Sequence, residues 1–95
     1  DLFWSRRYAE AEAQFKQASQ HHQDARFEYY LGMSLMAQQS DSKRRAAYSA
    51  FEQGARLEAS NRPSMGEVNA SMERVQGSLR SFVNTFRQKA RTAAN

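Results

Sequence analysis

The sequence predicts an all-α fold, in which antiparallel helical hairpins stack into one short array of about five to six helices. Apolar residues recur at intervals of three or four along most of the chain, the spacing that places side chains on one helical face. The 95 residues include one proline and four glycines, which are too few for a loop-rich all-β fold. A pattern of small, large and small residues occurs twice, at Ala11, Phe15 and Ala18 and again at Ala47, Phe51 and Gly54.

The first two helices are predicted over residues 7–20 and 25–38. One face of the first carries Tyr8, Ala11, Phe15 and Ala18. Between the two helices, Asp24 is placed to act as an N-cap, because its carboxylate can accept a hydrogen bond from a free backbone N–H of the helix that follows. The inner face of the second helix is expected to carry Phe27, Tyr30, Leu31, Ser34 and Leu35.

A third helix is predicted over residues 42–58, and the turn before Pro63 must end it, because the residue before a proline is disfavoured in the α region. Ser64 and Glu67 have the spacing of a capping box, so another helix is expected to begin there. An apolar stripe from Met65 to Phe86 would suit one long helix. Gly77 and Ser78 interrupt it, and we favour a break or kink at that point over a single helix.

Leu31-Gly32 on the second predicted helix and the Ala47, Phe51 and Gly54 pattern on the third together resemble the tetratricopeptide repeat (TPR) family. Leu31-Gly32 resembles the Leu-Gly pair of the repeat's first helix, and Ala47-x-x-x-Phe51-x-x-Gly54 resembles the pattern of its second helix, with glycine where alanine is usual. The resemblance implies a right-handed TPR-like array spanning residues 1–95 as a single domain. Residues 1–23 would be the remnant of a first repeat, 24–59 a complete repeat, and 64–93 a diverged repeat or C-terminal capping helices.

The predicted first repeat lacks most of its first helix, of which only a last turn at residues 1–4 remains. Phe3, Trp4 and Phe15 would then be partly exposed. We therefore expect that the chain is an excerpt of a longer protein or that it self-associates through its N-terminal helix.

No motif in the sequence indicates an enzyme, a cofactor or a metal site. The chain has no cysteine, and the adjacent His21 and His22 diverge on a helix, so they cannot chelate one ion as an i, i+4 pair could. Glu10 and Glu12 diverge in the same way, which argues against an acid and base pair. No serine lies in a Gly-x-Ser-x-Gly motif, and the glycines do not cluster into a phosphate-binding loop. We therefore predict a non-enzymatic protein.

The resemblance implies that a peptide or a helix of a partner protein binds in a concave groove. Carried onto the complete repeat, the groove-lining positions are Arg26, Tyr29, Tyr30, Met33 and Met36. Tyr29 and Met33 could instead pack against a neighbouring helix. Their side chains are aromatic and apolar, whereas repeats that clamp a C-terminal carboxylate use basic and amide residues at such positions. The alternative function is a structural spacer or an oligomerisation segment of a larger repeat protein.

Positive charge is concentrated at the C-terminal end. The formal net charge is +4, and residues 74–95 hold five Lys or Arg and no acidic residue. Arg80, Arg87 and Arg91 would form a basic ridge on a helix that starts near Ser78. The ridge suits a solvated face or an acidic partner. Without interleaved aromatic residues it is a weak signal for nucleic acid, which we do not favour.

The length of the apolar stretches bears on membrane association, and the cysteine content bears on the cellular compartment. The longest apolar stretch, residues 29–37, is far shorter than the roughly 20 residues of a membrane span, so we expect no membrane partner. The lack of cysteine leaves the compartment undetermined, with the cytoplasm favoured. The sequence does not predict the partner's identity.

Overall fold

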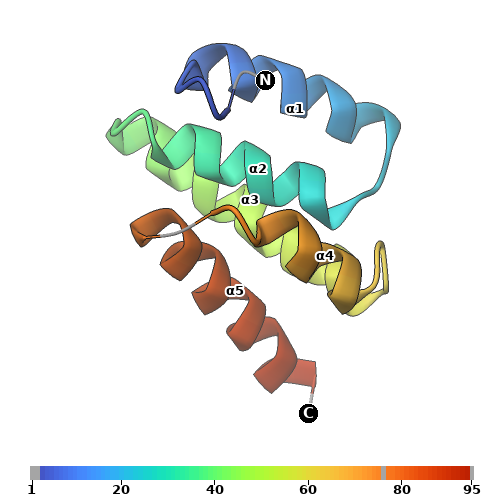
Figure 1. The fold of residues 1–95 in the computed structure, drawn as a ribbon. Coiled ribbons are helices and arrows are strands. Elements are labelled where there is room, and N and C mark those ends of the chain that lie inside the picture. The colour runs from blue at the N-terminus through green and yellow to red at the C-terminus, as the bar shows by residue number, and fades with distance from the viewer. Residues whose placement is uncertain (1–2, 76, 95) are drawn as a thin grey trace.

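A computed structural model describes residues 3–75 and 77–94, and it confirms an all-helical fold (Figure 1). The described residues form five α-helices and no strand. The helices are α1 (Tyr8–His21), α2 (Ala25–Met36), α3 (Asp41–Ala59), α4 (Met65–Met72) and α5 (Ser78–Ala94). Residues 1 and 2 of the predicted N-terminal remnant lie outside the described residues.

The ends of α1, α2 and α3 fall within two residues of the predicted ends, because the local chemistry that sets them is encoded in short segments. At the start of α2, Asp24 Oδ1 accepts a hydrogen bond from the backbone N–H of Arg26 at 2.8 Å. At the start of α4, Ser64 Oγ accepts one from the backbone N–H of Glu67 at 3.4 Å. Both predicted N-caps are confirmed.

The predicted break after α4 is also confirmed. Helix α4 ends at Met72, and α5 begins at Ser78 directly after Gly77, whose φ of +75° lies in the left-handed region that glycine adopts without strain. The Arg80 guanidinium donates hydrogen bonds to the carbonyl oxygens of Met72 and Val75, the latter at 3.3 Å. These bonds satisfy carbonyl groups that the end of a helix leaves without intrahelical partners.

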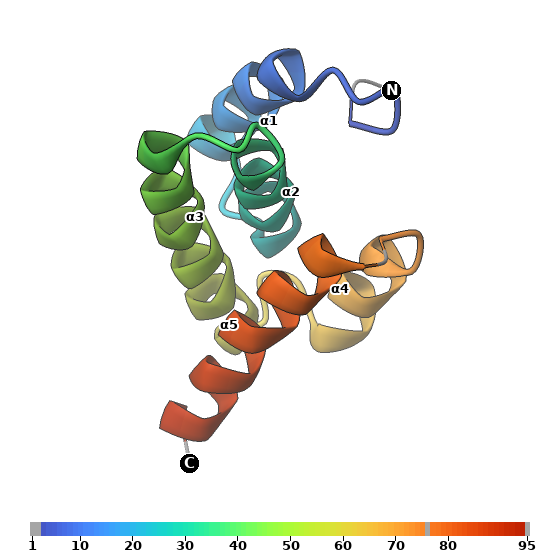
Figure 2. The ribbon, with the colours of Figure 1, turned by 90° about the vertical axis from the view of Figure 1, so that its left-hand side faces the viewer.

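Helix α2 is the centre of the fold, because it contacts all four of the other helices. It forms its most extensive contact with α3 and the next with α1, while α5 packs mainly on α3. Figure 2 shows α1 at one end of the molecule and the C-terminal half of α5 extending past the end of α3 at the other. The core therefore runs along both sides of α2.

Two glycines allow α2 and α3 to lie close together. A Cβ built at Gly32 of α2 would lie 2.4 Å from Cε1 of Phe51 on α3, and both residues are buried. A Cβ built at Gly54 of α3 would lie 2.7 Å from Cε1 of Tyr29 on α2. Each helix thus receives an aromatic ring from its partner at a position that has no side chain.

We expect Gly54→Ala to destabilise the protein, although alanine is the usual residue at this position of the repeat that the sequence resembles. Overpacking costs about 1–3 kcal/mol, and the higher helix propensity of alanine offsets about 1 kcal/mol of it. The Tyr29 ring has no room to retreat, because it is fully buried and its hydroxyl is held by Glu58 at 2.8 Å. The free energy of unfolding in urea should therefore fall, by up to about 2 kcal/mol.

The matched control is Gly66→Ala on α4, because a Cβ built at Gly66 meets no atom within 4 Å. This variant should be stabilised by up to about 1 kcal/mol through helix propensity alone. Equal effects of the two substitutions would contradict the close approach of α2 and α3.

The N-terminal turn packs on α2 through aromatic rings. Phe3 is only 5% exposed, and its ring lies edge-on to those of Trp4 and Tyr30, at centroid distances of 5.0 and 5.1 Å. The expected exposure of Phe3 is therefore wrong, because Tyr30 of α2 supplies the cover. Trp4 and Phe15 are half-buried, as expected.

Candidate functional site

The structure does not place the five predicted groove residues on an open surface. Tyr29 and Met33 are fully buried, so the prediction that they line a groove is wrong, and the alternative that they pack against neighbouring helices is what the structure shows. Tyr29 packs against Gly54 of α3, and all four of the other helices contact α2. The sequence of residues 24–59 alone does not indicate that helices formed by other segments will cover α2.

The other three groove positions, Arg26, Tyr30 and Met36, are half-buried. Arg26 forms an ion pair with Asp24 at 2.6 Å, and the Tyr30 hydroxyl donates a hydrogen bond to the backbone carbonyl of Ser71 on α4. Burial raises the pKa of Tyr30, so its hydroxyl remains a hydrogen-bond donor at neutral pH. The Tyr30 bond links α2 to α4, whereas the Arg26 ion pair lies at the start of α2.

The predicted basic ridge is also wrong as a continuous surface. Arg87 is 5% exposed and points into the molecule, whereas Arg91 one turn later is exposed. Arg80 is half-buried and bonded to the end of α4. Only Arg91 of the three remains an exposed cation.

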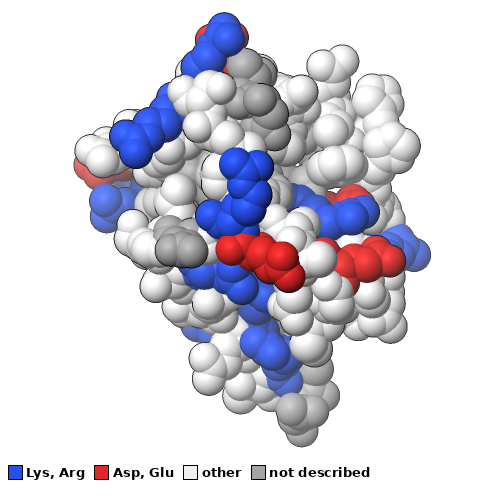
Figure 3. Space-filling model, viewed as in Figure 1, with Lys and Arg blue, Asp and Glu red and all other residues white. Residues whose placement is uncertain are grey.

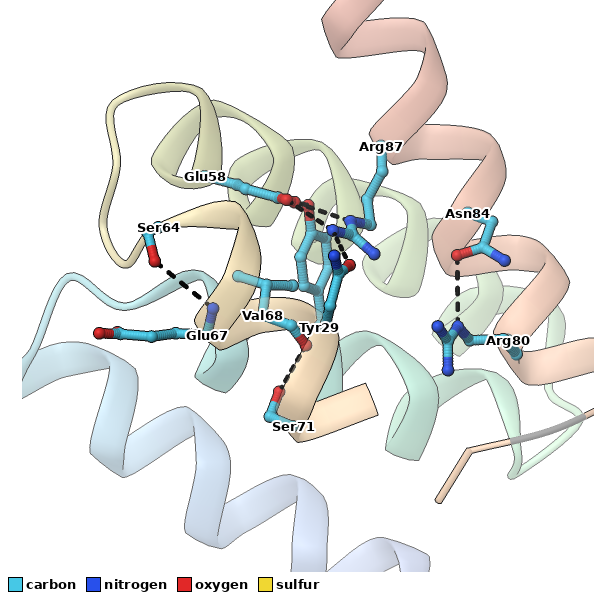
Figure 4. Close-up of polar contacts among 10 residues, drawn as sticks. Tyr29, Glu58, Ser64, Glu67, Val68, Ser71, Arg80, Asn84 and Arg87 are labelled. Carbon is cyan, nitrogen blue, oxygen red and sulfur yellow. Dashed lines mark hydrogen bonds and ion pairs between the residues drawn. The ribbon is translucent and has the colours of Figure 1, made fainter. Parts of the chain in front are cut away.

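Arg87 belongs to a buried polar cluster that joins four helices (Figure 4). Its Nε and Nη2 donate to Glu58 Oε1 and Oε2 of α3 at 2.9 and 2.7 Å, the two-pronged geometry that suits a guanidinium and a carboxylate. Nη2 also donates to Asn69 Oδ1 of α4 at 2.7 Å, and Tyr29 of α2 donates its hydroxyl to Glu58 Oε1 at 2.8 Å. We call Tyr29, Glu58 and Arg87, together with their exposed neighbour Asn69, the buried polar cluster.

The chemistry of the buried polar cluster is that of a structural link. Burial, then the hydrogen bond and charge of Glu58, raises the pKa of Tyr29 above the ordinary range of a tyrosine, so the phenol stays protonated. No buried side-chain nitrogen or oxygen among the described residues lacks a hydrogen-bond partner. The charges of Glu58 and Arg87 are therefore matched within the fold.

An open cleft of about 380 Å³ lies beside the buried polar cluster, between α3, the turn before α4 and the C-terminal half of α5. Glu58 and Arg87 form its inner end, and its apolar walls are Ala55, Ala59, Met65 and Ala90. A second hollow of about 380 Å³ shares Ala55 and Ala90 and continues the depression toward Phe86. We call the two hollows together the α3–α5 cleft.

The rim of the α3–α5 cleft is polar and carries an available cation. Asn61 and Arg91 line it, and Arg91 is exposed and forms no ion pair with any described residue. Met65 is 46% exposed and is the large hydrophobic residue that stands out on the described surface. In Figure 3, Lys and Arg lie beside Asp and Glu across the middle of the molecule, while blue side chains alone continue toward the C-terminal end of α5.

Sequence reasoning missed the α3–α5 cleft, although part of the signal was present. Arg87 follows Val83 by four residues, which places it on the same face as the apolar stripe and so toward the core. Met65 starts that stripe, but it lies in the first turn of α4 with its side chain exposed. The sequence does not indicate that the small residues of the cleft wall lie together. Their common position depends on how α5 packs on α3, and they are Ala55, Ala59 and Ala90.

Two further findings bear on the class of the protein. Among residues 3–75 and 77–94, no three His, Asp or Glu side chains gather in a group that could hold a metal ion. In the same part of the chain, no helix combines the length and the apolar character needed to cross a membrane. Comparisons of the chain with protein-family models, with curated proteins and with solved structures found no match.

Proposed function

We propose that the chain is a non-enzymatic interaction scaffold that binds a helix or an extended peptide of a partner protein in the α3–α5 cleft. The observation that carries this proposal is the combination, in one open depression, of alanine walls, an exposed methionine and an unpaired arginine at the rim. Ligand sites typically combine mainly apolar walls with a few polar groups that fix orientation.

The side chains of the cleft favour a particular partner chemistry. Ala55, Ala59 and Ala90 leave room for a partner backbone to approach closely, because each has only a methyl group. The flexible thioether of Met65 adapts to apolar side chains of different shapes. Arg91 adds a donor for a carboxylate, so the partner segment should carry apolar residues beside an Asp or Glu.

A relationship to tetratricopeptide arrays remains part of the proposal. It is supported by the α2 and α3 hairpin, in which Gly32 receives Phe51 and Gly54 receives Tyr29. The proposed binding surface nevertheless differs from the concave groove that the resemblance implies, since α4 and α5 contact α2 and its groove positions are covered. The α3–α5 cleft lies at the end of the array instead.

The proposal can be tested by selecting binders from a displayed library of random peptides against the purified chain. Selected peptides should bind the wild type with saturation in isothermal titration calorimetry. Ala90→Phe should weaken their binding at least about tenfold, equivalent to 1.4 kcal/mol, because the ring fills the cleft. Ala13→Phe, on the exposed face of α1, is the matched control and should leave the affinity unchanged.

Two outcomes would overturn the proposal. One is that the selected peptides bind wild type, Ala90→Phe and Ala13→Phe equally. The other is that no peptide is enriched while the chain assembles with rising concentration in analytical ultracentrifugation, which would favour the oligomerisation function. Circular dichroism of both variants would show that lost binding does not reflect lost folding.

A further inference from the structure

The N-terminal turn and the segment between α4 and α5 enclose a second pocket, on another part of the surface. Figure 2 shows the turn and this segment on the same side of the molecule. The pocket has a volume of about 280 Å³, and it shares no lining residue with the α3–α5 cleft. Its aromatic residues are Phe3, Trp4 and Tyr8, so we call it the aromatic pocket.

Two cations line the aromatic pocket, and no acidic residue is among the described residues of its wall. Arg6 comes from the turn, where its φ of 60° and its backbone hydrogen bond to Phe3 O at 3.1 Å fix the backbone. Arg74 comes from the segment after α4. The side chains of both arginines form no ion pair or hydrogen bond with the described residues.

The position of Arg74 suits the recognition of an oxyanion. Its Cζ lies 4.2 Å from the centroid of the Trp4 ring, which is cation–π contact distance. A guanidinium held against an aromatic ring in this way loses little further freedom when its N–H groups bind a carboxylate, because its side chain is already ordered. The ring thus prepares Arg74 for an anionic ligand.

The floor of the aromatic pocket supplies apolar contact. Val75 is 4% exposed and Leu79 is half-buried, and both line the pocket beside Arg74. We propose that this pocket binds an acidic peptide segment, in which adjacent carboxylates engage Arg6 and Arg74 and a neighbouring aliphatic side chain rests on Val75 and Leu79. The site operates whether or not the α3–α5 cleft binds a partner.

A peptide fits these observations better than a nucleic acid does. Recognition of single strands depends on bases that stack on aromatic faces. Arg74 already lies against the Trp4 ring, and Phe3 and Tyr30 contact Trp4 edge-on at 5.0 and 6.3 Å. The available groups are therefore guanidinium donors and aliphatic surface, which match carboxylates and a leucine-like side chain.

Trp4 makes the test direct, because it is the only tryptophan in the sequence and lies in the pocket wall. The full chain is titrated with the capped peptide Glu-Glu-Leu and with its amide counterpart Gln-Gln-Leu, and binding is followed by Trp4 fluorescence and by calorimetry. We expect saturable binding of the acidic peptide and at least about tenfold weaker binding of the amide peptide, because the amide peptide cannot form charge-assisted hydrogen bonds to the two arginines.

Variants then identify the cations responsible. Arg74→Gln and Arg6→Gln should each weaken binding of the acidic peptide at least about tenfold in calorimetry, the low end expected for a charged hydrogen bond. The matched control is Arg45→Gln, an exposed position on α3 far from the pocket wall, which should leave binding unchanged. Variant folding is checked by circular dichroism.

The proposal is overturned if the two peptides bind equally, if neither binds up to millimolar concentration, or if Arg74→Gln behaves like Arg45→Gln. It is also overturned if an oligothymidylate binds in an Arg74-dependent and salt-sensitive manner while the acidic peptide does not, because the pocket would then serve nucleic acid. None of these results depends on the library selection against the α3–α5 cleft, so the two proposals fail separately.

Discussion

Arg87→Met is expected to lower the free energy of unfolding by about 3–5 kcal/mol, the cost of removing one partner from a buried ion pair. Glu58 would keep its charge in a site where its side chain is only 11% exposed, and it would lose two hydrogen bonds of 2.9 and 2.7 Å. Asn69 would lose its donor as well. Urea denaturation followed by circular dichroism measures the change.

Lys89→Met serves as the control, because it removes the same charge from an exposed position on the same helix. Its contact with the Phe86 ring at 5.6 Å is worth no more than about 1 kcal/mol. In the double variant Glu58→Gln with Arg87→Met, the loss should be smaller than the sum of the single losses, because no charge is left buried alone. Equal losses for Arg87→Met and Lys89→Met would rule out the buried polar cluster as a structural link.

The helices could be predicted from the sequence because the signals that define them are local. The apolar spacing from Tyr8 to Ala18 and the N-caps at Asp24 and Ser64 involve residues within a few turns of each other. Gly77 is equally informative, since it adopts a left-handed backbone conformation directly before α5 begins at Ser78.

The position of Arg87 shows where local reasoning stops. The spacing from Val83 places Arg87 on the apolar face of its helix, but burial of a charge is acceptable only when an opposite charge meets it. That opposite charge is Glu58, which is 29 residues away at the end of α3. The groove prediction for Tyr29 and Met33 is wrong for a similar reason, because their burial depends on contacts between α2 and other helices that no local pattern specifies.

The sequence also could not indicate that the unpaired cations Arg6 and Arg74 line one pocket. They are distant in the chain and come together only because the N-terminal turn packs on Tyr30 of α2, to which α4 is also bonded. Aromatic and basic residues that appeared separate in sequence are thus neighbours in space. The proposed acidic-peptide site depends on this long-range packing.

Phe51→Ala is expected to cost about 3–5 kcal/mol, a large part of the stability of a domain whose unfolding free energy is about 5–15 kcal/mol. Phe51 is fully buried, lies over Gly32, and has its ring centroid 5.4 Å from that of Phe86 on α5. Its removal would leave a cavity where α2, α3 and α5 meet. Thermal denaturation should show a midpoint lower by many degrees, or no cooperative transition.

Gly32→Ala should also destabilise the wild type, because the new methyl group would meet Phe51 ring atoms at 2.4 and 2.5 Å. In the Phe51→Ala background the ring is absent, so the same methyl group fills part of the cavity and improves helix propensity by about 1 kcal/mol. Gly32→Ala should therefore change sign, from destabilising with Phe51 present to stabilising without it. Where Phe51→Ala alone is too unstable, Phe51→Leu gives the same comparison. Simple additivity of the two substitutions would contradict the direct seating of the Phe51 ring on Gly32, since residues in contact are expected to couple by about 0.5–3 kcal/mol.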